Sequence, residues 1–260
     1  MRFNPFSFVG GYATSSITPV GLVFDFTSQD YQSGSLTWNS AVGNYTASVT
    51  GTTSDPLIYN GGNTVGFDGN KWLQFDNNMT ASISSSQWEV YTLVNLATTS
   101  SVSYKPTFFA KGTDAPGWYY SYQGGTGANS GFGFINYQSG AGFVTDTLNN
   151  ASFNNGLKGV FPNTPQQFVL SYPSSSTFPT GPYTLNWYGN TNGSSTTGDI
   201  SNISPLSFSG SAASNLTFGF GVDGSNNYSG SVVRLYAYNR ILTSRERKDN
   251  WFALTGQYIP

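Results

Sequence analysis

The chain has 260 residues, of which 17% are aromatic and 8% are charged, and its formal net charge is −2. This composition, with 31 Gly, favours many short strands joined by turns in one domain, and it argues against nucleic-acid binding through phosphates. The chain has no Cys and no His, which excludes disulfides, Cys–His and Ser–His–Asp nucleophiles, and His-based metal sites.

Residues 1–20 precede the first predicted strand and carry Phe3, Phe6 and Phe8 among Gly, Ser, Thr and Pro. This pattern suits either an arm that docks on a partner or an ordered edge segment, and we favour the arm. Residues 21–260 are predicted to form the folded domain. We expect no signal peptide, because the opening MRFNPFSFVGG lacks a long apolar stretch, and no membrane insertion, because no run of about 18 apolar residues occurs.

Strand patterns follow one another along most of the chain. Gly21–Thr27 is the first, and we expect Leu22, Phe24 and Phe26 on one of its faces. Trp88–Leu96 is apolar on both faces, which predicts a central strand. The other predicted strands are Ser35–Asn39, Asn44–Val49, Leu57–Tyr59, Val65–Phe67, Trp72–Phe75, Thr107–Lys111, Gly117–Gln123, Gly131–Gln138, Gln166–Tyr172 and Tyr183–Asn190. A loop is predicted for the Ser/Thr/Gly-rich stretch Ser194–Pro205, which lacks a core face.

Two strand patterns and a helix pattern close the sequence. Apolar residues alternate with small ones in Leu216–Val222, as in a half-buried strand. In the next strand we expect one face to carry Val232, Arg234, Tyr236 and Tyr238, and the other to carry Val233, Leu235 and Ala237. The motif Thr243-Ser244-Arg245-Glu246 fits a capping box, which predicts a helix to about Leu254 that stops at Gly256.

The segment SGSVVRLYAYNRILTSRER and the short helix after it resemble the end of laminin-G-like domains, in the concanavalin A-like lectin/glucanase superfamily. Val65–Gly69 followed by Trp72–Phe75 resembles a hairpin of the same family. The resemblance covers about residues 21–260. It implies an all-β fold, a two-sheet antiparallel jelly-roll sandwich with a short C-terminal helix. It also implies a recognition module and not an enzyme.

Glycoside hydrolysis, which related enzymes of this fold perform, needs two carboxylates across the scissile bond. The chain has two Glu residues, and neither belongs to the clustered acid motif of laminarinase-type enzymes. Glu89 lies in an apolar strand pattern, and the capping box accounts for Glu246. A pair from distant strands, such as Asp25 with Asp76, stays open. We predict that the chain is not an enzyme and keep a laminarinase-like glycoside hydrolase as an alternative.

Calcium is the one cofactor that the sequence leaves open, since many laminin-G-like domains bind it. Asp, Asn and carbonyl oxygens are its ligands in proteins. The candidate ligands are Asp68, Asp76 and Asp223. The alternative interpretation is an ordinary turn at Asp68 and Asp223, because Asp-Gly is a common turn dipeptide.

Glycan binding is a more specific hypothesis than calcium binding. Sugars stack their apolar faces on exposed aromatic rings, and this chain is rich in aromatic residues. Trp118, Tyr120 and Tyr122 alternate within Gly117–Gln123 and are predicted to share one face. Tyr119 and its alternate neighbours take the other face, and both faces cannot be deep core. Further candidates are Trp187 and Tyr228. The alternative is that these rings form core and cross-strand pairs.

The function hypotheses rest on two features of the sequence. It has no Cys or His, and its N-terminal segment carries aromatic residues. The first is a virion component of a bacteriophage, as a capsid-decoration, head-fibre or tail-associated protein on the virion surface. Its partners would be other structural proteins, or further copies of itself in a homo-oligomer. Cell-surface glycans would be a further partner. A monomer without affinity for any assembled particle would contradict this. The alternative is an extracellular carbohydrate-binding module of a secreted or cell-surface protein.

Overall fold

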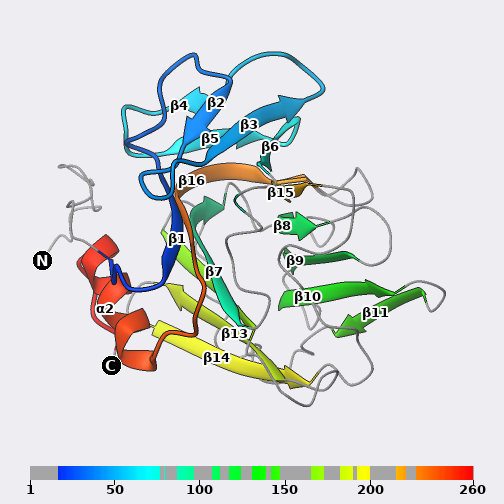
Figure 1. Cartoon of the computed structure of the whole chain (residues 1–260), viewed down its shortest axis with the longest axis vertical. Helices are drawn as coiled ribbons and strands as arrows, with labels where there is room; N and C mark the ends of the chain where they lie inside the picture. Colours follow the sequence, from blue (N-terminus) through cyan, green and yellow to red (C-terminus); the bar gives the residue numbers. More distant parts are fainter. Residues whose placement is uncertain are drawn as a thin grey trace, which may run out of the picture.

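Two antiparallel sheets and the C-terminal helix α2 (Ser244–Thr255) build the part of the chain that the computed structural model describes (Figure 1). That part is residues 17–76, 79, 87–96, 107–111, 117–123, 131–138, 142–146, 165–172, 182–189, 192–199, 215–220 and 227–259. The two sheets form a sandwich, and the predicted all-β fold with a short C-terminal helix is confirmed.

The first sheet, sheet A, has a long strand at its centre. Its strands in spatial order are β14 (Asn192–Asp199), β13 (Pro182–Gly189), β12 (Gln166–Tyr172), β7 (Trp88–Leu96), β16 (Ser229–Tyr238), β5 (Val65–Asp68) and β4 (Ile58–Tyr59). Strand β1 (Leu22–Thr27) pairs with the second half of β16, and β5 pairs with the first half. The prediction that Trp88–Leu96 is a central strand is confirmed, because β7 lies between β12 and β16.

The second sheet, sheet B, contains the three strands that were predicted at Thr107–Lys111, Gly117–Gln123 and Gly131–Gln138. Its strands in order are β11 (Gly142–Asp146), β10 (Gly131–Gln138), β9 (Gly117–Gln123), β8 (Thr107–Lys111), β15 (Leu216–Phe218), β6 (Lys71–Phe75), β3 (Thr46–Gly51) and β2 (Thr37–Asn39). Strand β11 was not predicted. The loop predicted for Ser194–Pro205 is wrong in its first part, since β14 pairs with β13 along its whole length. Backbone hydrogen bonds at a sheet edge do not require apolar side chains.

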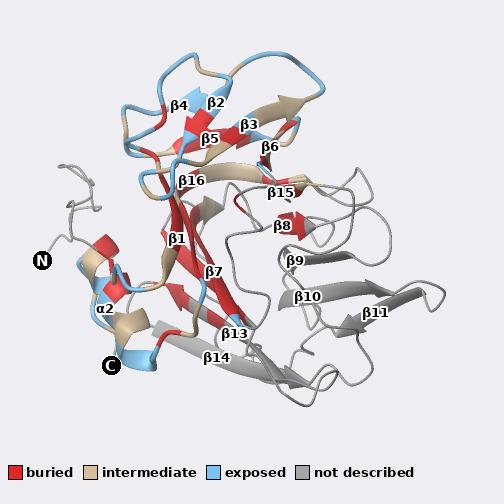
Figure 2. Ribbon diagram, in the orientation of Figure 1, coloured by how far each residue is buried: buried red, intermediate tan, exposed pale blue. Residues whose placement is uncertain are grey.

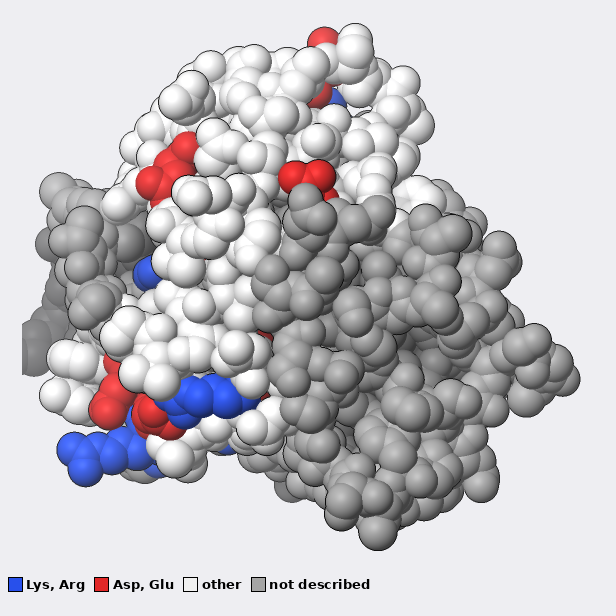
Figure 3. Space-filling model, viewed as in Figure 1, with Lys and Arg blue, Asp and Glu red and all other residues white. Residues whose placement is uncertain are grey.

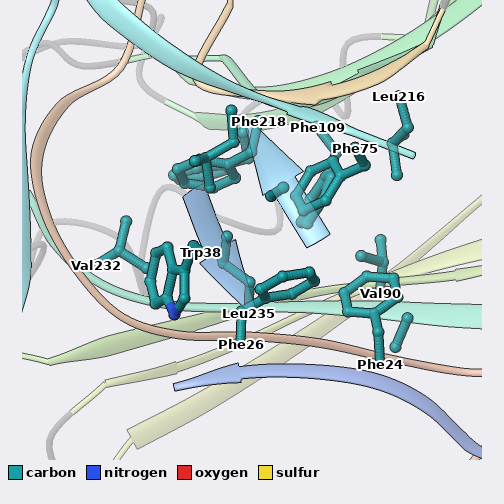
Figure 4. Close-up of a cluster of buried hydrophobic side chains, with 14 of the residues drawn as sticks. Phe24, Phe26, Trp38, Phe75, Val90, Phe109, Leu216, Phe218, Val232 and Leu235 are labelled. Carbon is teal, nitrogen blue, oxygen red and sulfur yellow. The ribbon is translucent and has the colours of Figure 1, made fainter. Parts of the chain in front are cut away.

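Aromatic rings fill the space between the sheets. Phe24 and Phe26 of β1 meet Phe75 of β6, at ring-centroid distances of 6.0 and 5.4 Å. Figure 4 shows these rings with Phe109 and Phe218 of sheet B on the facing side. Figure 2 shows that buried residues follow the central strands, whereas exposed residues gather in the loops around β2 and β4.

A second apolar cluster lies on the opposite, outer face of sheet A, where α2 packs. We call it the outer cluster, and its buried members are Ile17, Tyr91, Leu93, Val169, Tyr188, Val233, Tyr236, Tyr238, Leu242, Trp251 and Leu254. Because β7 and β16 bury both faces, their sequences are nearly continuously apolar.

Irregular pairing in β16 changes the predicted faces. The register shifts between Val232 and Arg234. Val232 therefore packs between the sheets with Leu235, whereas Val233 belongs to the outer cluster with Tyr236. The predicted alternation is wrong at these two valines, because one extra residue in a strand moves the following side chains to the other face.

The first strand has the same irregularity, with a register shift between Leu22 and Phe24. Phe24 and Phe26 face the core between the sheets, as predicted. Leu22 instead packs against the outer cluster, so the prediction that it shares their face is wrong.

The predicted ends of α2 are confirmed. The Thr243 side chain accepts a hydrogen bond from the backbone N–H of Glu246, and the Glu246 carboxylate accepts one from the backbone N–H of Thr243 at 2.8 Å. Gly256 ends the helix in the left-handed conformation at φ 69°, which costs a glycine little. Hydrogen bonds from Arg240 and from the cap lower the pKa of Glu246 from its ordinary value of 4.5 to about 2.

We expect Glu246→Gln to flatten the dependence of stability on pH in acid. Because the folded pKa is depressed, Glu246 contributes stability above its unfolded pKa of about 4.3, and this is lost as pH falls toward 2. Measurements of the unfolding free energy between these pH values will show a smaller loss in the variant. Asp249→Asn, which alters an exposed acid on the same helix, is the control, and an equal effect of both would contradict the assignment.

Candidate functional site

The backbone register places the aromatic positions that the sequence predicted for glycan binding. Trp118 pairs with Lys111 of β8, and Lys111 pairs with Leu216, which is buried between the sheets. Since paired positions share a face, position 118 and its alternate neighbours 120 and 122 lie on the core-facing side of sheet B. Tyr120 pairs with Phe134 of β10, and Tyr122 with Phe132. Positions 119, 121 and 123 take the opposite side.

The other two predicted ring positions also belong to core-facing sides. Trp187 pairs with Phe168, which packs between the sheets, so position 187 lies on that side of sheet A. Tyr228 is fully buried, 5.6 Å from the Phe67 ring, and its hydroxyl donates to the Ser231 carbonyl at 3.0 Å. The prediction that Tyr228 contacts a glycan is therefore wrong, because its ring is part of the core.

Glu89, one of the two glutamates considered for catalysis, is fully buried and holds α2 to sheet A. Its carboxylate accepts hydrogen bonds from Tyr91 Oη and Ser171 Oγ, both at 2.6 Å. It also accepts from the Leu242 backbone N–H at 3.1 Å and from Arg247 Nε at 2.9 Å. Burial and the nearby Glu89 charge raise the pKa of Tyr91. A carboxylate with this many structural donors is not free to act on a substrate.

The proposed acid pair of Asp25 with Asp76 is divided between the two sheets. Asp25 lies on β1 in sheet A, where Arg234 Nε donates to its Oδ1 at 2.6 Å and Arg234 Nη2 to its Oδ2. Asp76 follows β6 in sheet B and is exposed. Asp25 is thus neutralised by a bidentate guanidinium contact, which is typical of a structural ion pair.

Two of the three calcium candidates, Asp68 and Asp76, lie in the described part of the chain. Asp68 Oδ1 accepts from the Asn70 backbone N–H at 2.9 Å, and Asp68 Oδ2 lies 3.6 Å from Lys71 Nζ. These contacts are those of a turn. Asp223 lies outside the described residues. In the described part of the chain, no group of three or more acidic, His or Cys side chains is arranged to hold a metal ion.

A polar clamp joins the two ends of the described chain, and no sequence pattern pointed to it. Thr18 donates to Asn250 Oδ1 from its backbone N–H at 2.8 Å and from its hydroxyl at 3.0 Å. Asn250 Nδ2 in turn donates to Tyr238 Oη at 3.0 Å, and Tyr238 Oη donates to the Thr18 carbonyl at 2.9 Å. We call these three residues the Thr18 clamp. They hold residues 17–20, which the sequence assigned to the arm or edge segment, against α2.

Charged side chains are sparse on the described surface. Figure 3 shows most of them gathered near α2, with broad uncharged areas elsewhere on the described part of this face. The pairs at α2 are Arg240 with Glu246 and Arg245 with Asp249. Among the described helices, none is long and apolar enough to span a membrane.

These features define the chain as a two-sheet antiparallel β-sandwich domain. No protein-family model matches its sequence, and no curated protein matches it either. Solved structures do share the fold. Domain 4 of AbnA, an extracellular GH43 arabinanase of Geobacillus stearothermophilus, in complex with arabinotriose, is similar at a TM-score of 0.55 and 15% identity. The similarity covers 88% of this chain and 97% of that domain.

Two further structures share the sandwich over part of their own length. The binding domain of botulinum neurotoxin serotype D/C has a TM-score of 0.54 and 11% identity, covering 92% of this chain and 53% of that chain. Trypanosoma rangeli sialidase has a TM-score of 0.54 and 14% identity, covering 92% of this chain and 33% of that enzyme. At these identities the comparisons establish the fold, and the laminin-G-like assignment stays a prediction.

Proposed function

We propose that this chain is a non-catalytic β-sandwich domain that binds neutral glycans. The observation that carries the proposal is the likeness to the arabinanase domain, which extends over nearly the whole of both chains. The structure of that domain holds arabinotriose, a neutral oligosaccharide. A shared fold alone does not define a ligand, so the surface chemistry must support the same conclusion.

The described surface supports a neutral ligand. Its charged groups are few on the face shown in Figure 3, and three of the candidate acids have structural partners. Glu89 is bound by Arg247, Asp25 by Arg234, and Glu246 by Arg240 and the helix cap. A glycosidase would require two carboxylates left free to face the scissile bond.

The test is a screen of the purified chain against neutral oligosaccharides, with arabinotriose included, at concentrations up to millimolar. We expect saturable binding to at least one neutral glycan and no release of reducing sugar. Trp118→Ala and Tyr119→Ala form a matched pair, because these adjacent positions lie on opposite sides of β9. Loss of binding in one of the two identifies the side of the sheet that is used. A blank screen at millimolar concentrations contradicts the proposal.

A more specific proposal is that this glycan-binding domain lies on the surface of a virion, and it rests on the sequence alone. Residues 1–16 carry Phe3, Phe6 and Phe8 and lie outside the described residues. In this proposal they would join the domain to a shell or to other copies of the chain. An extracellular binding module remains the alternative. Both assignments are compatible with glycan binding by the sandwich.

A further inference from the structure

Large apolar side chains are exposed at a few places in the part of the chain that the structure describes. They are Val20, Leu36, Ile58, Tyr59, Phe252 and Tyr258. The aromatic rings among them occupy two separate places. Tyr59 lies on β4, the edge strand of sheet A, and Phe252 lies on α2 with Tyr258 just beyond it. Because the apolar face of a sugar stacks on an exposed ring, each place is a candidate subsite for the proposed glycan.

The place beside α2 suits a neutral sugar poorly. The rings of Phe252 and Tyr258 stack on each other, with centroids 4.2 Å apart and planes 26° apart. Arg245 and Asp249 form an exposed ion pair on the same side of the helix as Phe252, since these positions are three or four residues apart. The exposed rings at this place therefore lie beside charged groups.

The surroundings of Tyr59 differ in charge. Residues 31–54 and 56–67, which include β2 to β4 and most of β5, contain no Asp, Glu, Lys or Arg. The acids next to these stretches along the chain are Asp30 and Asp55. Figure 2 shows that exposed residues gather in the loops of this end of the molecule. An uncharged, exposed surface around an aromatic ring suits a neutral sugar.

Two asparagine amides lie in the turn that joins β4 to β5. Asn60 and Asn63 are both exposed. Asn60 Nδ2 donates to Thr64 Oγ1 at 3.0 Å. An amide group has a second N–H and an oxygen besides, so Asn60 has a further donor and an acceptor for a ligand. Such groups match the hydroxyl groups of a sugar, which both donate and accept.

The Tyr59 ring is supported from the core side. It lies 6.3 Å from the ring of Tyr31, which is buried. The Tyr31 hydroxyl donates to the Ser35 carbonyl at 2.5 Å and accepts from the Leu57 N–H at 3.1 Å. Leu36, the neighbour of Ser35, adds an exposed apolar side chain to the same end of the sandwich. The ring of Tyr59 thus rests on a side chain that is itself held at two points.

The turn after Tyr59 is held as well. Ser28 Oγ donates to the carbonyls of Gly62 and Asn63, at 2.8 and 3.1 Å. Gly62 has a φ of +82°, and a Cβ at this position would lie 3.3 Å from Tyr59 Oη. The backbone of the turn therefore passes close to the Tyr59 hydroxyl. A ring and amides that are positioned before binding lose little freedom when a ligand arrives.

We propose that the Tyr59 ring stacks against one residue of a neutral glycan, and that the amides of Asn60 and Asn63 bind the hydroxyl groups of this residue. The proposal rests on the proposed function and names a subsite for it at the β4–β5 hairpin. Tyr59 is 36% exposed, so the sugar reaches the ring from solvent and needs no cavity. Figure 1 shows β4 at the top of the molecule and α2 at the lower left, so the subsite is remote from the helix.

The test uses the full chain with arabinotriose, or with the neutral oligosaccharide that binds best in the screen. Tyr59→Ala is expected to weaken binding about tenfold or more, which corresponds to about 1.4 kcal/mol of binding free energy. Tyr59→Phe keeps the ring and should keep most of the affinity. Tyr258→Ala removes the other exposed tyrosine and is the matched control, which leaves the affinity unchanged.

A second readout uses the wild-type chain, so it does not depend on how the variants fold. The ring proton resonances of Tyr59, assigned with Tyr59→Phe, are expected to shift when the sugar is added. Those of Tyr258, assigned with Tyr258→Phe, should stay in place. Should Tyr59→Ala fail to fold, these resonances still decide.

The outcomes separate the subsite from the function. If the glycan binds but the Tyr59 resonances do not shift and Tyr59→Ala keeps the wild-type affinity, the subsite is overturned while the proposed function stands. The same holds if Tyr258→Ala loses binding in place of Tyr59→Ala. If no neutral glycan binds the wild-type chain, both proposals are overturned.

Discussion

Arg247→Met is expected to lower the free energy of unfolding by about 3–5 kcal/mol, the usual result of removing one partner of a buried ion pair. Glu89 is fully buried, and the side chain of Arg247 is 12% exposed. The substitution leaves the Glu89 carboxylate with Tyr91, Ser171 and the Leu242 N–H but without a countercharge. Since Arg247 lies on α2, the helix loses its main polar attachment to β7. Urea unfolding followed by tryptophan fluorescence measures the loss.

The control for this prediction is on the same helix. Arg245 pairs with Asp249 at 3.7 Å, but its side chain is 91% exposed, so Arg245→Met should change stability by no more than about 0.5 kcal/mol. The double variant Glu89→Leu/Arg247→Met should recover part of the loss, because it removes the uncompensated charge. Equal losses from Arg245→Met and Arg247→Met would show that Glu89 does not depend on its countercharge.

Trp38→Ala is expected to cost about 3–5 kcal/mol of unfolding free energy, as large-to-small changes in a core do. Trp38 is fully buried on β2, an edge strand of sheet B. Its ring lies 6.0 Å from that of Phe26 and 5.7 Å from that of Tyr31, both in edge-on contacts. Its indole N–H donates to the Thr27 carbonyl at 2.9 Å. The residue therefore joins the edge of sheet B to β1 of sheet A.

Trp72→Ala serves as the matched control, because Trp72 is only partly buried and its described ring contact is with Phe220 at 4.7 Å. We expect it to cost about 1 kcal/mol, near the average for single substitutions. Thermal unfolding of the two variants gives the comparison. A smaller loss in Trp38→Ala than in Trp72→Ala would mean that the contact between the sheets at β2 contributes little.

The parts of the fold that local chemistry determines could be predicted from the sequence. The ends of α2 follow from Thr243, Glu246 and Gly256, whose effects act within one or two turns. The central position of β7 follows from its apolar character on both faces. The irregular positions at Val233 and Leu22 could not be predicted, because an extra residue in a strand is defined by its partner strand and not by its own alternation.

The side of the sheet on which the aromatic candidates lie could not be predicted for a related reason. Alternation showed that Trp118, Tyr120 and Tyr122 share a face, but only the pairing of Trp118 with Lys111, and of Lys111 with Leu216, shows that this face is the core-facing one. The Thr18 clamp joins residues more than 200 positions apart, which no local pattern connects.

The Thr18 clamp has a consequence for how the domain is oriented when it is attached to something larger. Residues 17–20 are bound to α2, and Ile259 packs against the outer cluster, so both ends of the described chain are held on the helix side of the molecule (Figure 1). A connection made through either end therefore anchors the domain from that same side. In both cases the β9–β11 end of sheet B lies on the side away from the anchor (Figure 1).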